Sequence, residues 1–343
     1  LSAPPLSAPP GAPFLPGLSA PPAPADDELE GMVGGSATMR EVFAQARRVA
    51  PSEATLLILG EGGTGKETLA RAMHRLSPRR HRPFVPVYCE AIPETRIEGE
   101  LFGCERGALP GAHTARAGLC EAAEGGTLLL NDVAELPTRV QARLLRFLQT
   151  GEVRRVGASR ARHVDVRLIA TTHRDLVQRV RDGSFLSDLY FRLRLHEIRL
   201  PPLRQRPGDA VRIAESLLRR HAWAMAQAPL TLSAEARAAV AAAPWPGNVR
   251  ELENAVHRAI VLAERGEIAP AHLGLDASSP PPVPPADALE AEPPSDSLEG
   301  YFRRFVLEHQ AALTETEIAR RLGISRKTLW ERRQRLGIPR ARS

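Results

Sequence analysis

The sequence predicts an α/β fold: a parallel sheet flanked by helices, then a helical lid, then a small all-α module with a helix-turn-helix. Three observations predict this organisation. Short apolar runs typical of buried strands alternate with helical patterns through the body of the chain. Residues 209–265 then show a helical pattern alone. Two proline-rich segments enclose this body and set apart a basic segment at the carboxyl end.

The first proline-rich segment is expected to be a linker over residues 1–30. Residues 1–25 carry no charge and repeat LSAPP-like units. Proline at this density removes backbone donors and favours extended polyproline II structure, so the segment builds no core. Because a linker joins domains, we expect a further domain upstream, whose identity the sequence does not give.

The α/β core is expected at residues 31–205 and the lid at residues 206–275. Each buried-strand candidate in the core is followed by a helical pattern, which favours crossover connections and a parallel sheet. The candidates are Thr55–Leu59, Phe84–Val87, Thr127–Leu130 and Val166–Ala170. A second proline-rich linker follows at residues 276–297.

The remaining segment, residues 298–343, holds the excess of positive charge. Residues 301–343 carry a net charge of +7, whereas the whole chain of 343 residues carries +6. Helical patterns at Leu298–Leu313 and Glu315–Leu322 precede a turn at Gly323, and Ser325 is placed to cap a last helix that ends at Leu336. This is the pattern of a helix-turn-helix that binds DNA, with a solvated basic hairpin as the alternative.

Composition points to a cytoplasmic protein. The chain has no apolar stretch of membrane-spanning length, and its N-terminus lacks the pattern of a signal peptide. Its three cysteines, Cys89, Cys104 and Cys120, lack metal-site spacing, so we expect buried reduced thiols.

A glycine-rich loop between the first core strand and the next helix carries the main chemical signal. In that position, glycine allows backbone N–H groups to converge on a phosphate, and the helix N-terminus adds partial positive charge. Lys66 is one of only two lysines in the chain, so its place in this loop is informative. The candidate nucleotide-binding residues are Gly60, Glu61, Gly62, Gly63, Thr64, Gly65, Lys66, Glu67 and Thr68.

Six motifs together resemble the sigma-54-dependent transcriptional activators, which are bacterial enhancer-binding AAA+ proteins with a C-terminal Fis-type helix-turn-helix. In order, the motifs are GEGGTGKE, ELFGCERGALPGA, GGTLLLNDV, DVRLIATTHRDL, DLYFRL and WPGNVRELEN. The resemblance implies an AAA+ core with a helical lid, ATP and Mg²⁺ as cofactors, and assembly into rings. It also implies sigma-54 RNA polymerase and promoter or enhancer DNA as partners.

The resemblance assigns roles to single residues. Lys66 would reach the β- and γ-phosphates, and Arg250 matches the arginine of the lid that senses nucleotide. Arg192 matches one of two arginines that reach into the neighbouring subunit's site.

The hydrolytic residues depart from the family pattern at five positions. The family has Asp-Glu where this chain has Asn131 and Asp132, so both the Mg²⁺-binding and the water-polarising positions are changed. Asparagines are replaced at two further positions, and the second intersubunit arginine is lost; these three positions are Tyr88, His173 and Leu186. Five changes in one site predict weak or absent hydrolysis.

The loop that contacts sigma-54 in this family, GAFTGA, is also altered. It comprises Gly107, Ala108, Leu109, Pro110, Gly111 and Ala112. Leu109 lacks an aromatic face, and Pro110 lacks both a hydroxyl and an N–H. We therefore expect altered sigma-54 contact.

The preferred interpretation is a DNA-binding transcription regulator that binds ATP and oligomerises, from dimer to ring. Two alternatives remain: a fully active ATPase that remodels sigma-54 RNA polymerase, and a non-catalytic partner subunit in rings of intact paralogues. The candidate DNA-binding residues are Ser325, Arg326, Lys327, Thr328, Arg332 and Arg333.

Overall fold

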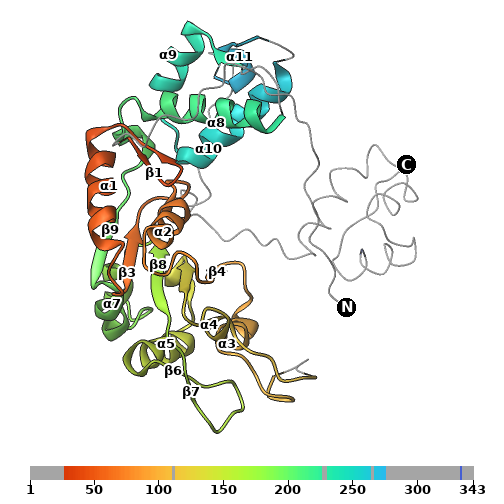
Figure 1. The fold of residues 1–343 in the computed structure, drawn as a ribbon. Coiled ribbons are helices and arrows are strands. Elements are labelled where there is room, and N and C mark those ends of the chain that lie inside the picture. The colour runs from red at the N-terminus through yellow and green to blue at the C-terminus, as the bar shows by residue number, and fades with distance from the viewer. Residues whose placement is uncertain (1–26, 110–112, 226–229, 264–265, 276–332, 334–343) are drawn as a thin grey trace, which may run out of the picture. The chain divides into compact units, whose positions relative to one another are not determined.

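The computed structural model describes residues 27–109, 113–225, 230–263 and 266–275, together with residue 333 (Figure 1). The chain divides into two compact units, Leu1–Pro281 and Pro282–Ser343. The account of the fold concerns the first unit. The predicted linker at 276–297 and the predicted helix-turn-helix lie outside the described residues, apart from Arg333.

One parallel sheet of five strands forms the centre of the first unit, in the order β4-β5-β8-β3-β9. The four predicted strands are all present, and the edge strand β9 was not predicted. The strands are β3 (Leu56–Leu59), β4 (Phe84–Tyr88), β5 (Thr127–Asn131), β8 (Arg167–Thr172) and β9 (His196–Arg199).

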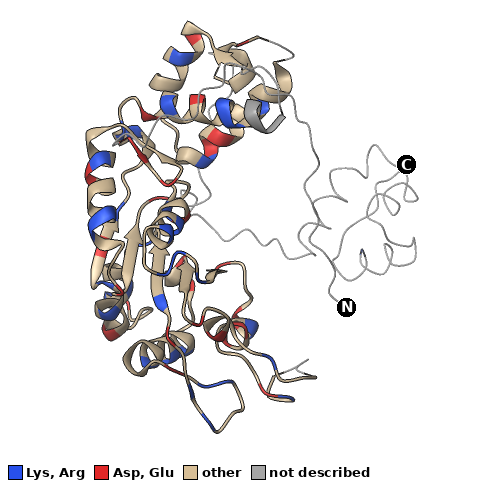
Figure 2. Cartoon of the chain, in the orientation of Figure 1, with Lys and Arg blue, Asp and Glu red and all other residues tan. Residues whose placement is uncertain are grey.

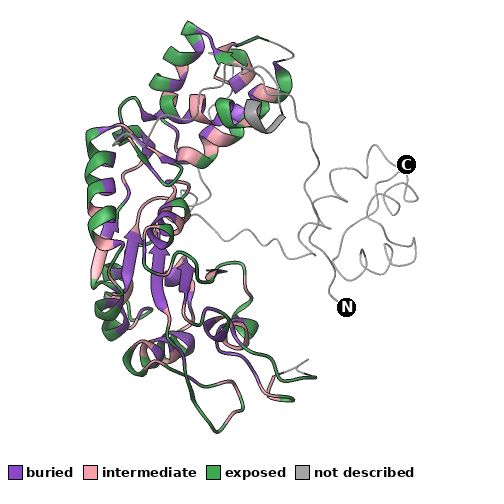
Figure 3. Cartoon of the chain, viewed as in Figure 1, coloured by how far each residue is buried: buried purple, intermediate pink, exposed green. Residues whose placement is uncertain are grey.

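The inner strands β5, β8 and β3 are largely apolar because both faces of the sheet are covered there. Every residue of β5 and β8 is buried, and Figure 3 shows the inner strands of the sheet in the colour of buried residues. Alternate side chains enter different clusters: Leu57 packs on one face, and Leu56 and Ile58 pack on the other.

Helices cover the two faces (Figure 1). On the face of Leu56 lie α1 (Ala37–Val49), which Ser36 caps through its side chain, and α2 (Lys66–Arg75). The other face packs against α3 (Glu94–Phe102), α5 (Thr138–Thr150) and α7 (Ser187–Leu193). Shorter elements complete this part: β1 (Glu28–Leu29), β2 (Met32–Val33), α4 (Leu119–Ala122), the 3₁₀ helix η1 (Val133–Glu135), β6 (Glu152–Val153), β7 (Arg162–His163), α6 (Leu176–Arg181) and the 3₁₀ helix η2 (Leu203–Gln205).

The lid follows the sheet and has its own apolar cluster, with Trp245 and Leu252 among its buried members. Its helices are α8 (Asp209–Met225), α9 (Ala234–Ala242), α10 (Asn248–Leu262) and α11 (Pro270–Leu273). The prediction of helices alone for the lid missed one feature, a parallel pair of two-residue strands. These strands are β10 (Thr231–Leu232) and β11 (Glu267–Ile268). Such short strands give too little alternation to stand out in a sequence.

Acidic and basic residues are interspersed over α1 and the lid helices (Figure 2). In the described part of the chain, no helix combines the length and apolar character needed to cross a membrane. Cys89, Cys104 and Cys120 are buried and unpaired with one another, as predicted.

Candidate functional site

The glycine-rich loop joins β3 to α2, as the sequence predicts. Gly65 stands at the N-terminus of α2 with φ +98°, and Gly63 has φ +73°, both in the region that favours glycine. A Cβ on Gly63 would lie 2.2 Å from the carbonyl oxygen of Gly247, so only glycine fits there. The loop therefore keeps its backbone close to the lid.

Lys66 is the first residue of α2 and folds back over the loop. Its Nζ donates to the carbonyl oxygens of Gly60 and Glu61 at 2.8 and 3.0 Å. Burial lowers the pKa of Lys66 and the nearby charge of Arg250 lowers it further, while Asp132 and Glu61 oppose that shift. The charges of the lid arginine and of Asp132 therefore both act on Lys66.

The start of α10 is attached directly to the loop. The backbone N–H groups of Val249 and Arg250 donate to Gly63 O at 3.0 and 3.3 Å. Asn248 makes the other connections: its Nδ2 donates to Gly62 O at 3.0 Å, and its Oδ1 accepts from the N–H of Leu203 at 2.7 Å.

Sequence analysis did not select Asn248, which is fully buried with φ +56°. Asparagine tolerates this left-handed conformation better than most residues. The only signal in the sequence for this conformation was the position of Asn248 directly after Gly247, in a turn.

A cavity of about 140 Å³ lies beside the loop, between the N-terminal segment and the lid. Apolar side chains of Met32, Ile213 and Leu217 line it, together with Thr68 and Arg206. Arg206 is almost fully buried, donates to the carbonyl oxygens of Pro201 and Thr64, and burial lowers its pKa to about 10. Arg206 therefore joins the loop to the beginning of the lid.

The carboxyl ends of β5 and β8 bring three predicted residues together. His173 follows β8, and its Nδ1 lies 2.8 Å from Oδ1 of Asp132, which follows β5 with φ +55°. Asn131 ends β5, and its Oδ1 accepts from the Thr171 hydroxyl at 3.0 Å. Burial alone would raise the pKa of Asp132, but the hydrogen bond with His173 and the charge of Lys66 hold it below its usual value.

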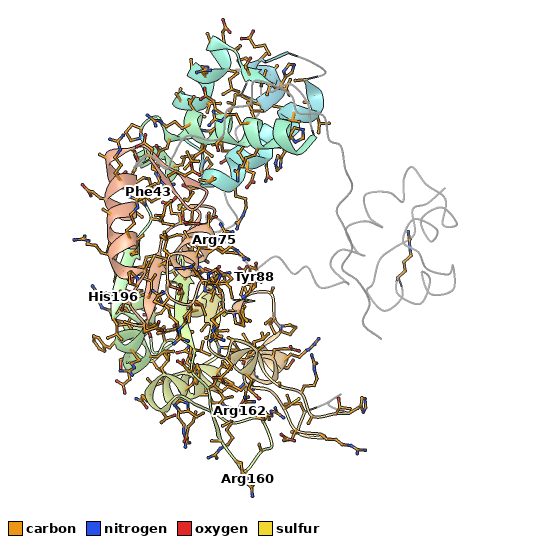
Figure 4. The ribbon with its side chains drawn as sticks, viewed as in Figure 1. Phe43, Arg75, Tyr88, Arg160, Arg162 and His196 are labelled. Atoms are coloured by element: carbon orange, nitrogen blue, oxygen red, sulfur yellow. The ribbon has the colours of Figure 1, made fainter. Side chains whose placement is uncertain are left out.

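Tyr88 lies at the carboxyl end of β4 and is about half exposed (Figure 4). Its hydroxyl donates to Glu67 Oε1 at 3.1 Å, and the same oxygen accepts from Arg71. Tyr88 therefore contacts α2, and no hydrogen bond between Tyr88 and Asp132 is found among the described residues.

Comparison with known proteins decides the family. Residues 32–199 match the model of the Sigma-54 interaction domain, and residues 204–287 match the AAA+ ATPase lid domain. FlbD of Caulobacter vibrioides, a transcriptional regulatory protein, is 42% identical over 88% of this chain and 70% of its own length. The chain belongs to the sigma-54-dependent activator family.

Other sigma-54 activator relatives agree. The Nif-specific regulatory protein of Azotobacter vinelandii is 44% identical over 90% of this chain, and this chain spans 59% of that protein's length. ZraR of Escherichia coli K12 is 44% identical over 87% of this chain and 67% of its own length. The crystal structure of NtrX from Brucella abortus in complex with ADP superposes with a TM-score of 0.65 at 30% identity, covering 91% of this chain and 70% of NtrX. The structure of NtrX in complex with ATP superposes with a TM-score of 0.63 at 29% identity, covering 92% of this chain and 71% of NtrX. The fold is that of an AAA+ core with a helical lid.

Of the two intersubunit positions of the sigma-54 activator pattern, Arg192 lies at the opposite end of the sheet from Lys66. The guanidinium of Arg192 donates to Leu148 O at 2.9 Å and borders a cavity of about 330 Å³ at the amino ends of β3 and β8. Leu186 is partly buried against the apolar cluster on the sheet face that packs against α3, α5 and α7. The site around Lys66 therefore does not include Arg192 from its own chain.

The loop predicted to contact sigma-54 is described only at Gly107, Ala108 and Leu109; Pro110, Gly111 and Ala112 lie outside the described residues. A Cβ on Gly99 would lie 2.6 Å from Leu109 Cδ1, so Leu109 packs against α3. Bridges from Cys104 to Arg116 and Val156 hold this loop beside the hairpin of β6 and β7, at whose far end Arg160 projects (Figure 4).

Of the candidate DNA-binding residues, Ser325, Arg326, Lys327, Thr328 and Arg332 lie outside the described residues. Arg333 is described, is helical, and is 4% exposed. A side chain buried to this degree is poorly placed to contact phosphate, which is at odds with the role predicted for it. Counting basic residues in the sequence could not distinguish a buried arginine from a projecting one.

Proposed function

We propose that this chain is a DNA-binding transcription regulator of the sigma-54 activator family that binds ATP and hydrolyses it slowly or not at all. The ATP site lies in a core at residues 31–205 closed by a lid at residues 206–275. The observation that carries the nucleotide proposal is the attachment of α10 to the glycine-rich loop at Gly63, which gathers Lys66 and Arg250.

In this proposal the phosphates lie along residues Gly60 to Thr68. Lys66 exchanges its two carbonyl acceptors for phosphate oxygens, and the N-terminus of α2 adds partial positive charge. The cavity beside Met32, Ile213 and Leu217 receives the base. The solved complexes of NtrX with ADP and with ATP support this ligand class.

The contacts of the hydrolytic residues support slow turnover. Asp132 is bound to His173, so the carboxylate proposed to polarise the attacking water is already engaged. Asn131 offers no charge to a metal ion. Arg192 remains as the single arginine that a neighbouring subunit would supply, because Leu186 cannot stabilise developing charge.

The third part of the proposal concerns partners. The helix-turn-helix at residues 298–343 binds DNA, and the chain oligomerises, from dimer to ring. Contact with sigma-54 through Gly107–Ala112 is weakened, since Leu109 packs on α3 and offers no aromatic ring.

One observation favours a second candidate, a non-catalytic subunit in rings of intact paralogues. Arg192 lies at the opposite end of the sheet strands from Lys66, which supports a role at a neighbour's site even if its own site is inactive. Mixing this chain with an intact paralogue and measuring ATP turnover against the mixing ratio distinguishes a contributing subunit from an inert one.

The test of the main proposal combines two measurements on the purified chain. Fluorescent ATP should bind, and Lys66→Ala should abolish that binding. Steady-state turnover should stay well below about 1 s⁻¹, the lower end of ordinary enzymes. No binding at millimolar nucleotide would refute the ATP site, and ordinary turnover would refute slow hydrolysis.

A further inference from the structure

The amide of Asn131, which ends β5 and directly precedes Asp132, has an unmet hydrogen-bonding capacity. Asn131 is 8% exposed, and its Nδ2 is buried with no hydrogen-bond partner in the described part of the chain. A buried amide donor without a partner is unfavourable, so such a group in a native structure calls for a ligand or another explanation.

Thr171 fixes which way this amide faces. Its hydroxyl oxygen accepts from the N–H of Asp132 at 3.3 Å, which leaves the hydroxyl hydrogen to donate to Asn131 Oδ1 at 3.0 Å. The side-chain oxygen is therefore engaged, and the two N–H groups of Nδ2 are the unused part. An amide is also uncharged in either orientation.

Three carboxylates near the loop are each bound to a basic side chain. Asp132 pairs with His173, and Glu67 pairs with Arg71 at 2.7 Å. Glu61 pairs with Arg204 at 2.5 Å. Within the described ranges, no group of three or more His, Cys, Asp or Glu side chains is arranged to hold a metal ion.

This donor set does not fit Mg²⁺, which the family pattern implies as a companion of ATP. Mg²⁺ binds one or two carboxylates together with phosphate oxygens and water. Here the position expected to supply the carboxylate offers a buried N–H donor instead, which repels a cation and attracts an anion. Lys66 and Arg250 lie close enough to influence each other and supply positive charge without a metal.

We infer that this site takes a nucleoside triphosphate without a requirement for a divalent cation, with Asn131 as a neutral donor to the anionic ligand and Lys66 and Arg250 as its counter-charges. The inference rests on the proposed nucleotide site. It adds a ligand class, metal-free nucleotide, and a residue that selects it.

The test measures the Kd of fluorescent ATP for the full chain in Mg²⁺ buffer and in excess EDTA. The two values should agree within about threefold, whereas Asn131→Asp should bind at least about tenfold more tightly in Mg²⁺ than in EDTA. Asn254→Asp, an exposed change of the same kind on α10, is the matched control and should keep the ratio of the unmodified chain.

Unmodified protein that binds about tenfold or more weakly in EDTA overturns the inference. Absence of binding in both buffers overturns the nucleotide site itself, and the inference with it. If Asn131→Asp does not fold, the Tm of the unmodified chain tests the inference. ATP in EDTA should raise this Tm as much as ATP with Mg²⁺ does. A rise in Tm only with Mg²⁺ contradicts the proposal.

Discussion

His173 Nδ1 lies 2.8 Å from Asp132 Oδ1, so the residues that follow two paired strands, β8 and β5, form a hydrogen-bonded imidazole–carboxylate pair. Asp132 sits in the left-handed region at φ +55°, which costs a non-glycine residue energy unless its surroundings hold it. The bond to His173 and the bond from its own N–H to Thr171 provide that hold. The pair keeps the carboxylate turned toward a protein partner.

Releasing this carboxylate should increase hydrolysis. We expect the triple variant Asn131→Asp, Asp132→Glu, His173→Asn to turn over ATP in Mg²⁺ buffer about 10²-fold faster than the unmodified chain, since it restores a metal-binding carboxylate and a longer, unpaired water-polarising one. Steady-state phosphate release measures this. His163→Asn, an exposed change, is the control, and an unchanged rate in the triple variant would contradict the explanation.

Asn248 should be needed for attachment of the lid. Asn248→Ala leaves the buried N–H of Leu203 without its acceptor and should lower the free energy of unfolding by about 2 kcal/mol. Asn248→Gly also loses the hydrogen bonds, but glycine adopts φ +56° without strain. The difference in stability between the Ala and Gly variants therefore measures backbone strain, and the loss that they share measures hydrogen bonding. Chemical denaturation measures both, with exposed Asn254→Ala as the control. Equal stability of all three variants would show that these bonds are not needed.

Glu121 should make the stability of the β6–β7 hairpin dependent on pH. Its carboxylate accepts from Arg155 at 2.7 and 2.9 Å, and this interaction, outweighing burial, holds the pKa of Glu121 below its usual value. A lowered pKa contributes stability that is complete above the unfolded value of about 4.3 and is lost as pH falls through the lower folded value.

Glu121→Gln should therefore melt at a lower temperature than the unmodified chain at pH 7, and the difference should shrink below about pH 4. Thermal melting from pH 3 to 7 measures it, with exposed Glu152→Gln as the control. A difference that stays constant with pH would exclude the ion pair as its cause.

The altered contact loop should limit engagement of sigma-54. We expect the unmodified chain to fail to open sigma-54 promoter complexes in a purified transcription assay. Leu109→Phe with Pro110→Thr should restore binding to sigma-54, because it returns an aromatic face, a hydroxyl and a backbone donor. Open complexes formed by the unmodified chain would show that the loop works as it stands.

Sequence patterns predicted the parts of this protein that depend on local order. The strand–loop–helix around Lys66 and the four central strands carry periodicity and glycine spacing that a single chain displays. The contacts of Asn248 with Gly62 and of His173 with Asp132 join residues far apart in the chain, so no local pattern reveals them. The edge strand β9 was missed for a related reason: its residues His196–Arg199 are mostly polar, and pairing with β3 makes them a strand.

The C-terminal segment should bind DNA as a two-fold dimer. A single helix-turn-helix reads few base pairs, so affinity usually comes from two modules. The predicted helix Leu298–Leu313 carries apolar residues such as Phe302 and Phe305 beyond what a short hairpin needs to cover, which favours a partner on that face. With a net charge of +7 over residues 301–343, affinity should fall steeply as salt rises.

Three arginine variants separate the roles within this module. Arg326→Ala should reduce preference among DNA sequences, because the start of the recognition helix faces base edges. Arg332→Ala should weaken binding to all sequences alike and reduce its salt dependence. Arg333→Ala should lower the melting temperature of the protein, because that side chain is buried. Gel shifts of the full chain across salt concentrations measure the first two effects, and salt-insensitive binding, or none, would leave only a solvated basic hairpin.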